Sequence, residues 1–253
     1  MARASVAFVT GGGRGIGRAC AIRLSRDGLA VAVGSRTESE GRAVASEISR
    51  AGGTALAVRL DVRDPESVNA AFESAETALG PVDVLVCAAG TASSAKFLET
   101  EPAAWAETLA VNLTGPMLCA RAVLDGMIER NFGRIVAIGS TASLAGAPYI
   151  AAYAASKHGL LGLVRSLAAE VARKDITVNC VCPGYVDTAM TGETIRRIVE
   201  KTGRSEEEAR TSLEAMNPRG RLLRPEEVAD TVSWLAREGT TAMNGQAVVV
   251  GGN

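Results

Sequence analysis

The sequence of 253 residues contains a single histidine, His158, and only five cysteines, none of them in a C-x-x-C pair. Structural zinc sites use several cysteine or histidine ligands at short spacings, and disulfide frameworks use an even number of cysteines. We therefore expect no metal site, and we expect the cysteines to lie buried as small apolar side chains in a reducing compartment. Cys180 and Cys182 alternate along a predicted strand, so their side chains should share one face.

The sequence has almost no net charge and no long apolar run. The 27 basic and 28 acidic residues leave a net charge of −1, which gives no electrostatic reason to expect nucleic acid or an anionic membrane as a partner. No apolar run approaches the ~20 residues that span a bilayer, and residues 1–9 lead into a strand without a cleavable leader. We expect a cytoplasmic protein that acts on a small molecule.

Short apolar runs alternate with longer segments of helical periodicity, and 47% of the residues are hydrophobic. The runs are apolar throughout, which is typical of parallel strands covered by helices on both faces. No repeat or linker interrupts this order, so we predict a single α/β domain over residues 1–253 with a doubly wound, seven-stranded parallel sheet. The expected strands are Val6–Val9, Ala30–Val33, Ala55–Leu60, Val82–Val86, Ile135–Ile138, Ile176–Val181 and Ala247–Val250.

Prolines and acidic residues indicate where helices begin. Pro65 and Pro102 occupy first helical positions, and Pro225 is followed by two glutamates. Pro116 lies inside a long periodic segment and is expected to kink it. The expected helices are Gly15–Asp27, Glu38–Ala51, Pro65–Leu79, Pro102–Arg130, Ala152–Lys174 and Pro225–Arg237.

Residues 188–219 interrupt the alternation with two charged, helix-prone stretches, 194–201 and 205–215. The segment follows the carboxyl end of the sixth strand, where α/β sheets bind ligands. We interpret it as a substrate lid, and a solvated surface excursion is the alternative.

A glycine-rich turn, Thr10–Gly17, joins the first strand to the first helix. Its glycines let backbone approach a pyrophosphate, and the helix N-terminus offers free N–H donors. Asp61 and Val62 follow the third strand, where the carboxylate can accept a hydrogen bond from an adenine amino group. The pattern predicts a dinucleotide site, and a merely tight turn is the alternative.

The end of the second strand, Gly34–Thr37, lacks the acid that would bind the ribose 2′-hydroxyl of NAD. Arg36 and Ser35, with Arg14 from the glycine turn, can instead hold a 2′-phosphate through charge-assisted hydrogen bonds. We expect NADP(H) as the preferred cofactor, with NAD(H) possible. The alternative is that both arginines are ordinary surface residues.

Tyr153 and Lys157 lie one helical turn apart, and Ser140 follows the fifth strand. A tyrosine near a cation can exchange a proton with a carbonyl or alcohol oxygen, which predicts hydride-transfer chemistry beside a nucleotide. Each residue alone is commonplace, so the prediction rests on their joint occurrence with the glycine turn.

The chain resembles the short-chain dehydrogenase/reductase family in five places: the glycine turn Thr10–Gly17, Asn112 in Val-Asn-Leu-Thr-Gly, Ser140, Tyr153-Ala-Ala-Ser-Lys157, and Pro183-Gly184. The resemblance covers essentially the whole chain. It implies a single Rossmann-type domain, a catalytic set of Asn112, Ser140, Tyr153 and Lys157, and usually a homotetramer, with a dimer possible.

The resemblance also implies individual roles. Asn112 would hold a water, Ser140 would orient the substrate oxygen, Lys157 would bind the nicotinamide ribose and depress the tyrosine pKa, and Thr188 would contact the cofactor. A buried asparagine can equally be satisfied by a backbone carbonyl. The expected cofactor-binding residues are Gly11, Arg14, Gly15, Ile16, Gly17, Ser35, Arg36, Asp61, Val62, Ala89, Gly90, Tyr153, Lys157, Pro183, Gly184, Val186 and Thr188.

Within this family the chain is similar to 3-oxoacyl and polyketide ketoreductases. The similarity implies an NADPH-dependent reductase that takes a 3-oxoacyl thioester or related ketone to the alcohol. One alternative is an NAD-linked dehydrogenase of hydroxyacyl compounds or secondary alcohols, and another is a nucleotide-binding sensor without turnover. The family's usual Asn-Asn-Ala-Gly is Cys87-Ala88-Ala89-Gly90 here, so we expect altered local support of the cofactor pocket.

Two surfaces are expected to bind other proteins. The helices Pro102–Arg130 and Ala152–Lys174 would pack against symmetry mates through Leu113, Met117, Leu160, Leu161 and Leu163. An acidic acyl carrier would find a basic rim near the entrance of the site, made of Arg130, Arg134, Arg173 and Lys174; the alternative is that Arg130, Arg173 and Lys174 complement helix dipoles.

Overall fold

The computed structural model describes residues 5–252, so residues 1–4 and 253 of the predicted domain lie outside the described chain. Within residues 5–252, one sheet contains seven strands, all paired in parallel, in the order β3-β2-β1-β4-β5-β6-β7. The strands are β1 Val6–Thr10, β2 Ala30–Ser35, β3 Ala55–Arg59, β4 Val82–Cys87, β5 Gly133–Ile138, β6 Ile176–Pro183 and β7 Ala247–Val250.

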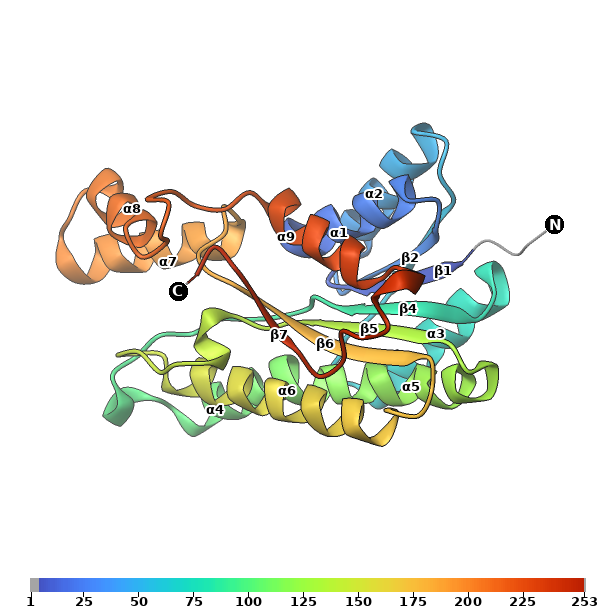
Figure 1. Ribbon diagram of the computed structural model, residues 1–253. Helices are drawn as coiled ribbons and strands as arrows, with labels where there is room; N and C mark the ends of the chain where they lie inside the picture. The colour runs from blue at the N-terminus through green and yellow to red at the C-terminus, as the bar shows by residue number, and fades with distance from the viewer. Residues whose placement is uncertain (1–4, 253) are drawn as a thin grey trace.

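Helices cover both faces of the sheet, as Figure 1 shows, and two further helices project beyond the carboxyl ends of its strands. One layer contains α1 Gly15–Arg26, α2 Glu38–Arg50 and α9 Pro225–Leu235. The other layer contains α3 Pro65–Leu79, α4 Pro102–Leu109, α5 Gly115–Arg130 and α6 Ala151–Glu170, and the projecting pair is α7 Ala189–Thr202 and α8 Glu206–Glu214. The predicted doubly wound α/β class is confirmed.

The predicted strands agree with the structure to within about two residues, but two helices differ. The segment expected as one helix over 102–130 contains a π-helical stretch, Ala110–Thr114, between α4 and α5. Pro116 has no N–H to donate to the carbonyl of Asn112, so the irregularity lies just before the proline. Helix α6 ends at Glu170, so Arg173 and Lys174 lie beyond its last turn and the dipole interpretation for them is wrong.

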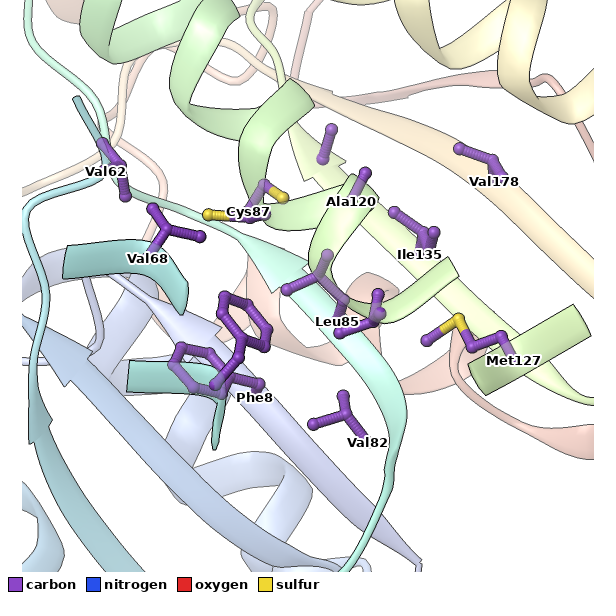
Figure 2. Packing of buried hydrophobic residues seen from close by; sticks show 14 of the residues in the cluster. Phe8, Val62, Val68, Val82, Leu85, Cys87, Ala120, Met127, Ile135 and Val178 are labelled. Carbon is purple, nitrogen blue, oxygen red and sulfur yellow. The ribbon is translucent and has the colours of Figure 1, made fainter. Parts of the chain in front are cut away.

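The core consists of apolar side chains on the two faces of the sheet. Figure 2 shows part of the face under α3, α5 and α6, where Phe8, Leu85 and Ile135 come from the neighbouring strands β1, β4 and β5. Leu160 and Leu161 of α6 belong to this core, so the prediction that they meet a symmetry mate is wrong. In the described part of the chain, no helix is long and apolar enough to cross a membrane.

The basic residues expected near the entrance of the site lie at the opposite end of the sheet in this chain. Arg134 is completely buried at the start of β5, where it donates to the backbone oxygen (2.8 Å) and side chain (2.9 Å) of Asp175. Arg130 donates to the carbonyl of Val82 at the start of β4, 2.8 Å away. These contacts hold helices to the amino ends of strands, so the predicted basic rim is wrong for the cleft of the same chain.

The aromatic pair in the core supplies a test of the packing. Phe8 is fully buried and stacks on Phe72 with ring centroids 4.0 Å apart. We expect Phe8→Ala to lower the free energy of unfolding by about 3–5 kcal/mol, because it removes buried area and leaves a cavity. Urea unfolding measures this loss, with Phe97→Ala, at a side chain 73% exposed, as the control within about 0.5 kcal/mol of wild type. Equal stability of the two variants would contradict the described core.

Candidate active site

The glycine turn after β1 has a backbone path that side chains would obstruct. Gly11 and Gly15 have positive φ angles of 63° and 53°. A Cβ on Gly17 would lie 2.2 Å from the carbonyl oxygen of Gly11, and one on Gly11 would lie 2.7 Å from Cα of Ala89. The turn therefore needs glycine at these positions, and it leaves the N-terminus of α1 without a side-chain cap. Such an end can receive a phosphate group.

A cleft of about 380 Å³ runs along this turn, between the connections that follow β1 and β4. Twelve of the predicted cofactor residues line it: Gly11, Arg14, Gly15, Ile16, Gly17, Ser35, Arg36, Asp61, Val62, Ala89, Gly90 and Thr188. The predicted residues Tyr153, Lys157, Pro183, Gly184 and Val186 are outside this lining. Residues that sequence reasoning did not assign to the cleft include Glu40, Arg63, Glu107 and Met190.

One end of the cleft contains a carboxylate that an arginine holds in place. Arg63 donates from Nε to Oδ1 of Asp61 at 2.9 Å and from Nη1 to Glu107 at 2.7 Å. The side-chain hydrogen bond from Arg63 is the main reason that the pKa of Asp61 falls to about 2. Asp61 is therefore a fixed anion and acceptor at neutral pH. The arginine two residues after the acid is the local sequence signal for this ion pair.

Ser140 lies beside Tyr153, close enough for the two side chains to interact. Ser140 caps the short 3-10 helix Thr141–Ser143, accepting from the backbone N–H of Ala142 at 3.1 Å. The hydroxyl of Ser143 in turn accepts from the backbone N–H of Ser140 at 3.2 Å. The turn after β5 thus fixes the position of Ser140 against the first turns of α6.

Lys157 lies one turn further along α6 and is almost fully buried. Its Nζ donates to the carbonyl of Ile138 at 2.7 Å and lies 5.7 Å from the ring centroid of Tyr153. Burial lowers the pKa of Lys157 to about 8 and raises the pKa of Tyr153. Interaction with the Ser140 side chain lowers the pKa of Tyr153, but by less than burial raises it. The protein chain by itself therefore does not produce the predicted depression of the tyrosine pKa.

Asn112 is buried in the π-helical stretch, and its amide is engaged by protein groups. Its Oδ1 accepts from the N–H of Thr91 at 2.9 Å, and its Nδ2 donates to the carbonyl of Thr91 at 2.9 Å and to Ser156 at 3.0 Å. The structure therefore contains the alternative arrangement, in which the amide of the buried asparagine forms hydrogen bonds with the backbone. Asn112 and the Nζ of Lys157 both lie against Gly90, within 3.5 and 3.9 Å of where its Cβ would be.

The substituted segment after β4 is supported from β1. Thr10 accepts hydrogen bonds from the N–H groups of both Ala88 and Ala89, each at 3.1 Å. Cys87 points into the core, and the five cysteines are buried as predicted. The sulfurs of Cys180 and Cys182 lie 3.7 Å apart, which confirms that they share one face of β6.

The residues after β6 reach the cleft through Thr188. A Cβ on Gly15 would lie 3.3 Å from the methyl group of Thr188, and Thr188 caps α7 by accepting from Thr191. Gly184 is packed differently: a Cβ there would lie 2.5 Å from the carbonyl oxygen of Gly251. Thr188 thus lies beside the glycine turn, whereas Pro183 is the last residue of β6 and Gly184 packs against Gly251.

Comparison with known proteins matches residues 5–198 to the short chain dehydrogenase family. The 3-oxoacyl-[acyl-carrier-protein] reductase FabG of Aquifex aeolicus is 36% identical over 98% of this chain and 96% of its own length. A 2-(S)-hydroxypropyl-CoM dehydrogenase of Xanthobacter autotrophicus is also 36% identical, over 98% of this chain and 95% of its own length.

Among solved structures, a variant of actinorhodin polyketide ketoreductase crystallised with NADPH is similar to this chain with a TM-score of 0.95. The two chains are 39% identical, and the match covers 98% of this chain and 96% of the other. The matches to the Aquifex reductase and to the ketoreductase structure each extend over the sheet, the glycine turn and the Ser140–Lys157 region.

The buried lysine predicts a specific pH dependence of stability. Because burial lowers the pKa of Lys157 from 10.5 to about 8, the unfolded chain binds an additional proton between these pH values. The stability of wild type relative to Lys157→Met should therefore rise by up to about 3 kcal/mol between about pH 7 and pH 10.5. Urea unfolding of both proteins across this range measures the difference, which cancels the titration of the shared thiols and tyrosines. Parallel curves would contradict the burial of a charged Lys157.

Proposed function

We propose that this chain, which belongs to the short-chain dehydrogenase family and is thus an NAD(P)-dependent oxidoreductase of CH–OH and C=O groups, is an NADPH-dependent carbonyl reductase. Its substrate is a 3-oxoacyl thioester or a polyketide-like ketone. The observation that carries the proposal is the position of Ser140, after β5, beside Tyr153 of α6, with the buried Lys157 one helical turn away and next to Gly90 of the cleft. The resemblance to ketoreductases over nearly the whole chain supports it.

The cleft suits a nicotinamide dinucleotide. Its glycine turn accepts a pyrophosphate at the N-terminus of α1, and Arg14 and Arg36 offer cations at the adenosine end. These two arginines, and the NADPH bound by the actinorhodin ketoreductase variant, support NADP(H) as the preferred cofactor. When bound, the cofactor supplies the hydride for carbonyl reduction.

Tyr153 is the proton donor in this proposal. Because burial raises its pKa, its hydroxyl carries a proton at neutral pH and can donate it to a substrate carbonyl oxygen. The Ser140 hydroxyl, fixed by the turn after β5, orients the same oxygen. The charge that develops on the tyrosine is stabilised by the Lys157 ammonium, which remains mostly protonated near neutral pH with its pKa at about 8.

Asn112 acts in this proposal by holding the polypeptide around the reactive groups. It ties Thr91, in the connection after β4, to Ser156, the neighbour of Lys157 on α6. This contact fixes the distance between the floor of the cleft and the helix that carries Tyr153. We propose this positioning role in place of the water contact that the family resemblance implied.

Three segments surround the proposed substrate entrance. The N–H of Ala95 donates to the carbonyl of Tyr149 at 2.9 Å, which joins the connections after β4 and β5. Arg197 of α7 donates to the carbonyl of Ala92 at 3.2 Å, which joins the proposed lid, residues 188–219, to the same connection. Phe97 and Leu98 are highly exposed beside this junction, and they suit the apolar part of an acyl or polyketide substrate.

The oxidative direction is the second candidate. The similarity to a hydroxypropyl-CoM dehydrogenase supports a dehydrogenase of hydroxyacyl compounds or secondary alcohols. The same residues serve both directions, since a proton donor in reduction is the proton acceptor in oxidation. A preference for NADH over NADPH would favour this candidate.

We also propose that the chain is a cytoplasmic homotetramer, with a dimer as the alternative. Helices α5 and α6 form an outward-facing groove lined by apolar side chains, including Met117, Leu124, Leu163 and Leu167. Met117 is 37% exposed although it is a large apolar residue, which supports contact with a second copy. This set replaces Leu160 and Leu161, which are buried in the core.

The proton-donor role predicts a selective loss. Tyr153→Phe should bind NADPH as wild type does, while kcat for ketone reduction falls by about 10²–10⁴-fold, because the variant lacks the donated proton. The measurement is NADPH binding by fluorescence, followed by turnover of a panel of ketones and 3-oxoacyl thioesters with both reduced cofactors. Unchanged turnover in the variant would refute the role, and a clear NADH preference of wild type would overturn the interpretation of Arg36.

The groove on α5 and α6 predicts the state of association. Wild type should sediment as an oligomer at micromolar concentration, and Leu163→Arg should shift it to smaller species, because a charge in an apolar interface is not solvated. Analytical ultracentrifugation measures this, with the exposed Arg165→Lys on the same helix as the control. A monomeric wild type would rule out the proposed assembly.

A further inference from the structure

An acidic side chain lies beside the glycine turn although the end of β2 has none. A Cβ added to Gly13 would lie 2.8 Å from Cβ of Glu40 and 2.9 Å from the hydroxyl of Ser35. Glu40 and Ser35 therefore flank the same point of the turn. Glu40 is half-buried and lines the cleft together with Arg14 and Arg36.

The approach of α2 to β2 brings Glu40 into the lining of the cleft. Gly41 packs directly on β2: a Cβ there would lie 3.3 Å from Cβ of Ser35. Because Gly41 has no side chain, the first turn of α2 sits close to the strand, and the Cβ of Glu40, the residue before it, lies against the glycine turn at Gly13. An acidic residue from α2 thus lies beside Ser35 at the end of β2, which is where NAD-binding folds carry the acid that binds the ribose.

Glu40 differs from the other acid of the same helical turn. Glu38 is exposed and forms an ion pair with Arg42 one turn away. Among the contacts of residues 5–252, Glu40 has neither an ion pair nor a side-chain hydrogen bond. The helix dipole generally stabilises acidic residues in the first turn, and Glu38 already provides such a residue on the exposed side of α2. The dipole does not explain why a second acidic residue, Glu40, lies in the lining of the cleft.

The groups around this point favour different ligands. Arg14, Arg36 and the N-terminus of α2 attract the 2′-phosphate of NADP(H). The hydroxyl of Ser35 already donates to the carbonyl of Thr37 at 3.0 Å, so its oxygen can accept a hydrogen bond but its proton is engaged. A ribose hydroxyl can donate to Ser35 and Glu40, whereas a 2′-phosphate meets the negative charge of Glu40.

We infer that Glu40 is a specificity-determining residue of the dinucleotide site: it accepts a hydrogen bond from the adenosine ribose of NAD(H) and repels the 2′-phosphate of NADP(H). The inference rests on the proposed function, since it concerns the cofactor of that site. The chain prefers NADP(H) through its arginines, and Glu40 keeps this preference small enough for NAD(H) to bind.

Direct binding tests this inference without turnover. Dissociation constants for NADPH and NADH are measured by fluorescence titration for wild type, Glu40→Gln and Glu38→Gln, with thermal melting to verify that each protein is folded. Glu40→Gln keeps the shape of the side chain and removes its charge. We expect it to bind NADPH about fivefold more tightly and NADH about fivefold more weakly, so that the ratio of the two constants changes by roughly 25-fold.

Glu38→Gln is the matched control, because it removes one charge from the same helical turn outside the cleft. Its ratio of dissociation constants should stay within about twofold of wild type. An unchanged ratio in Glu40→Gln, or an equal change in both glutamine variants, would overturn the inference. If Glu40→Gln does not fold, Glu40→Ala is measured in the same way. Failure of wild type to bind either dinucleotide would instead refute the proposed function.

Discussion

The seven strands all run in one direction, and this constraint determines where the site lies. The strand order reverses between β1 and β4, so the connections after these two strands leave toward opposite faces and open a crevice between them. The glycine turn fills one side of the crevice, and Ala88–Gly90 fill the other, close enough that Gly11 cannot carry a side chain. Ser140, at the end of β5, and Thr188, after β6, reach the same edge because their strands are parallel to β1.

Burial of Lys157 has opposite effects on stability and on chemistry. Removing an ammonium from water destabilises the fold, and a single hydrogen bond to the carbonyl of Ile138 offsets only part of that cost. The same burial strengthens its electrostatic interaction with any charge that forms on Tyr153, since the lysine is shielded from water. A lysine that remained in solvent would cost less and would stabilise a tyrosinate less. The fold thus retains a local instability where the proposed chemistry needs a fixed cation.

The sequence predicts features that depend on neighbours along the chain, and it fails where distant segments meet. Continuous apolar runs identify the strands, and the four-residue spacing of Tyr153 and Lys157 places them on one side of α6. The position of Arg134 could not be read in this way, because a basic residue at the start of a strand looks exposed until the carbonyls that bury it are known. The same limit applies to Leu160 and Leu161, since helical periodicity does not say which apolar stripe faces the sheet.

Cofactor choice shows the same limit at the level of function. The rule for NAD-binding folds examines the residue at the end of β2, where this chain has Ser35 and Arg36 instead of an acid. A carboxylate acts through its position in space, however, and the close packing of Gly41 on β2 brings Glu40 of the first turn of α2 near that position. The electrostatic field at the ribose is the sum over Arg14, Arg36, Glu40 and the end of α2. Under this proposal, no single position in the sequence determines which dinucleotide binds.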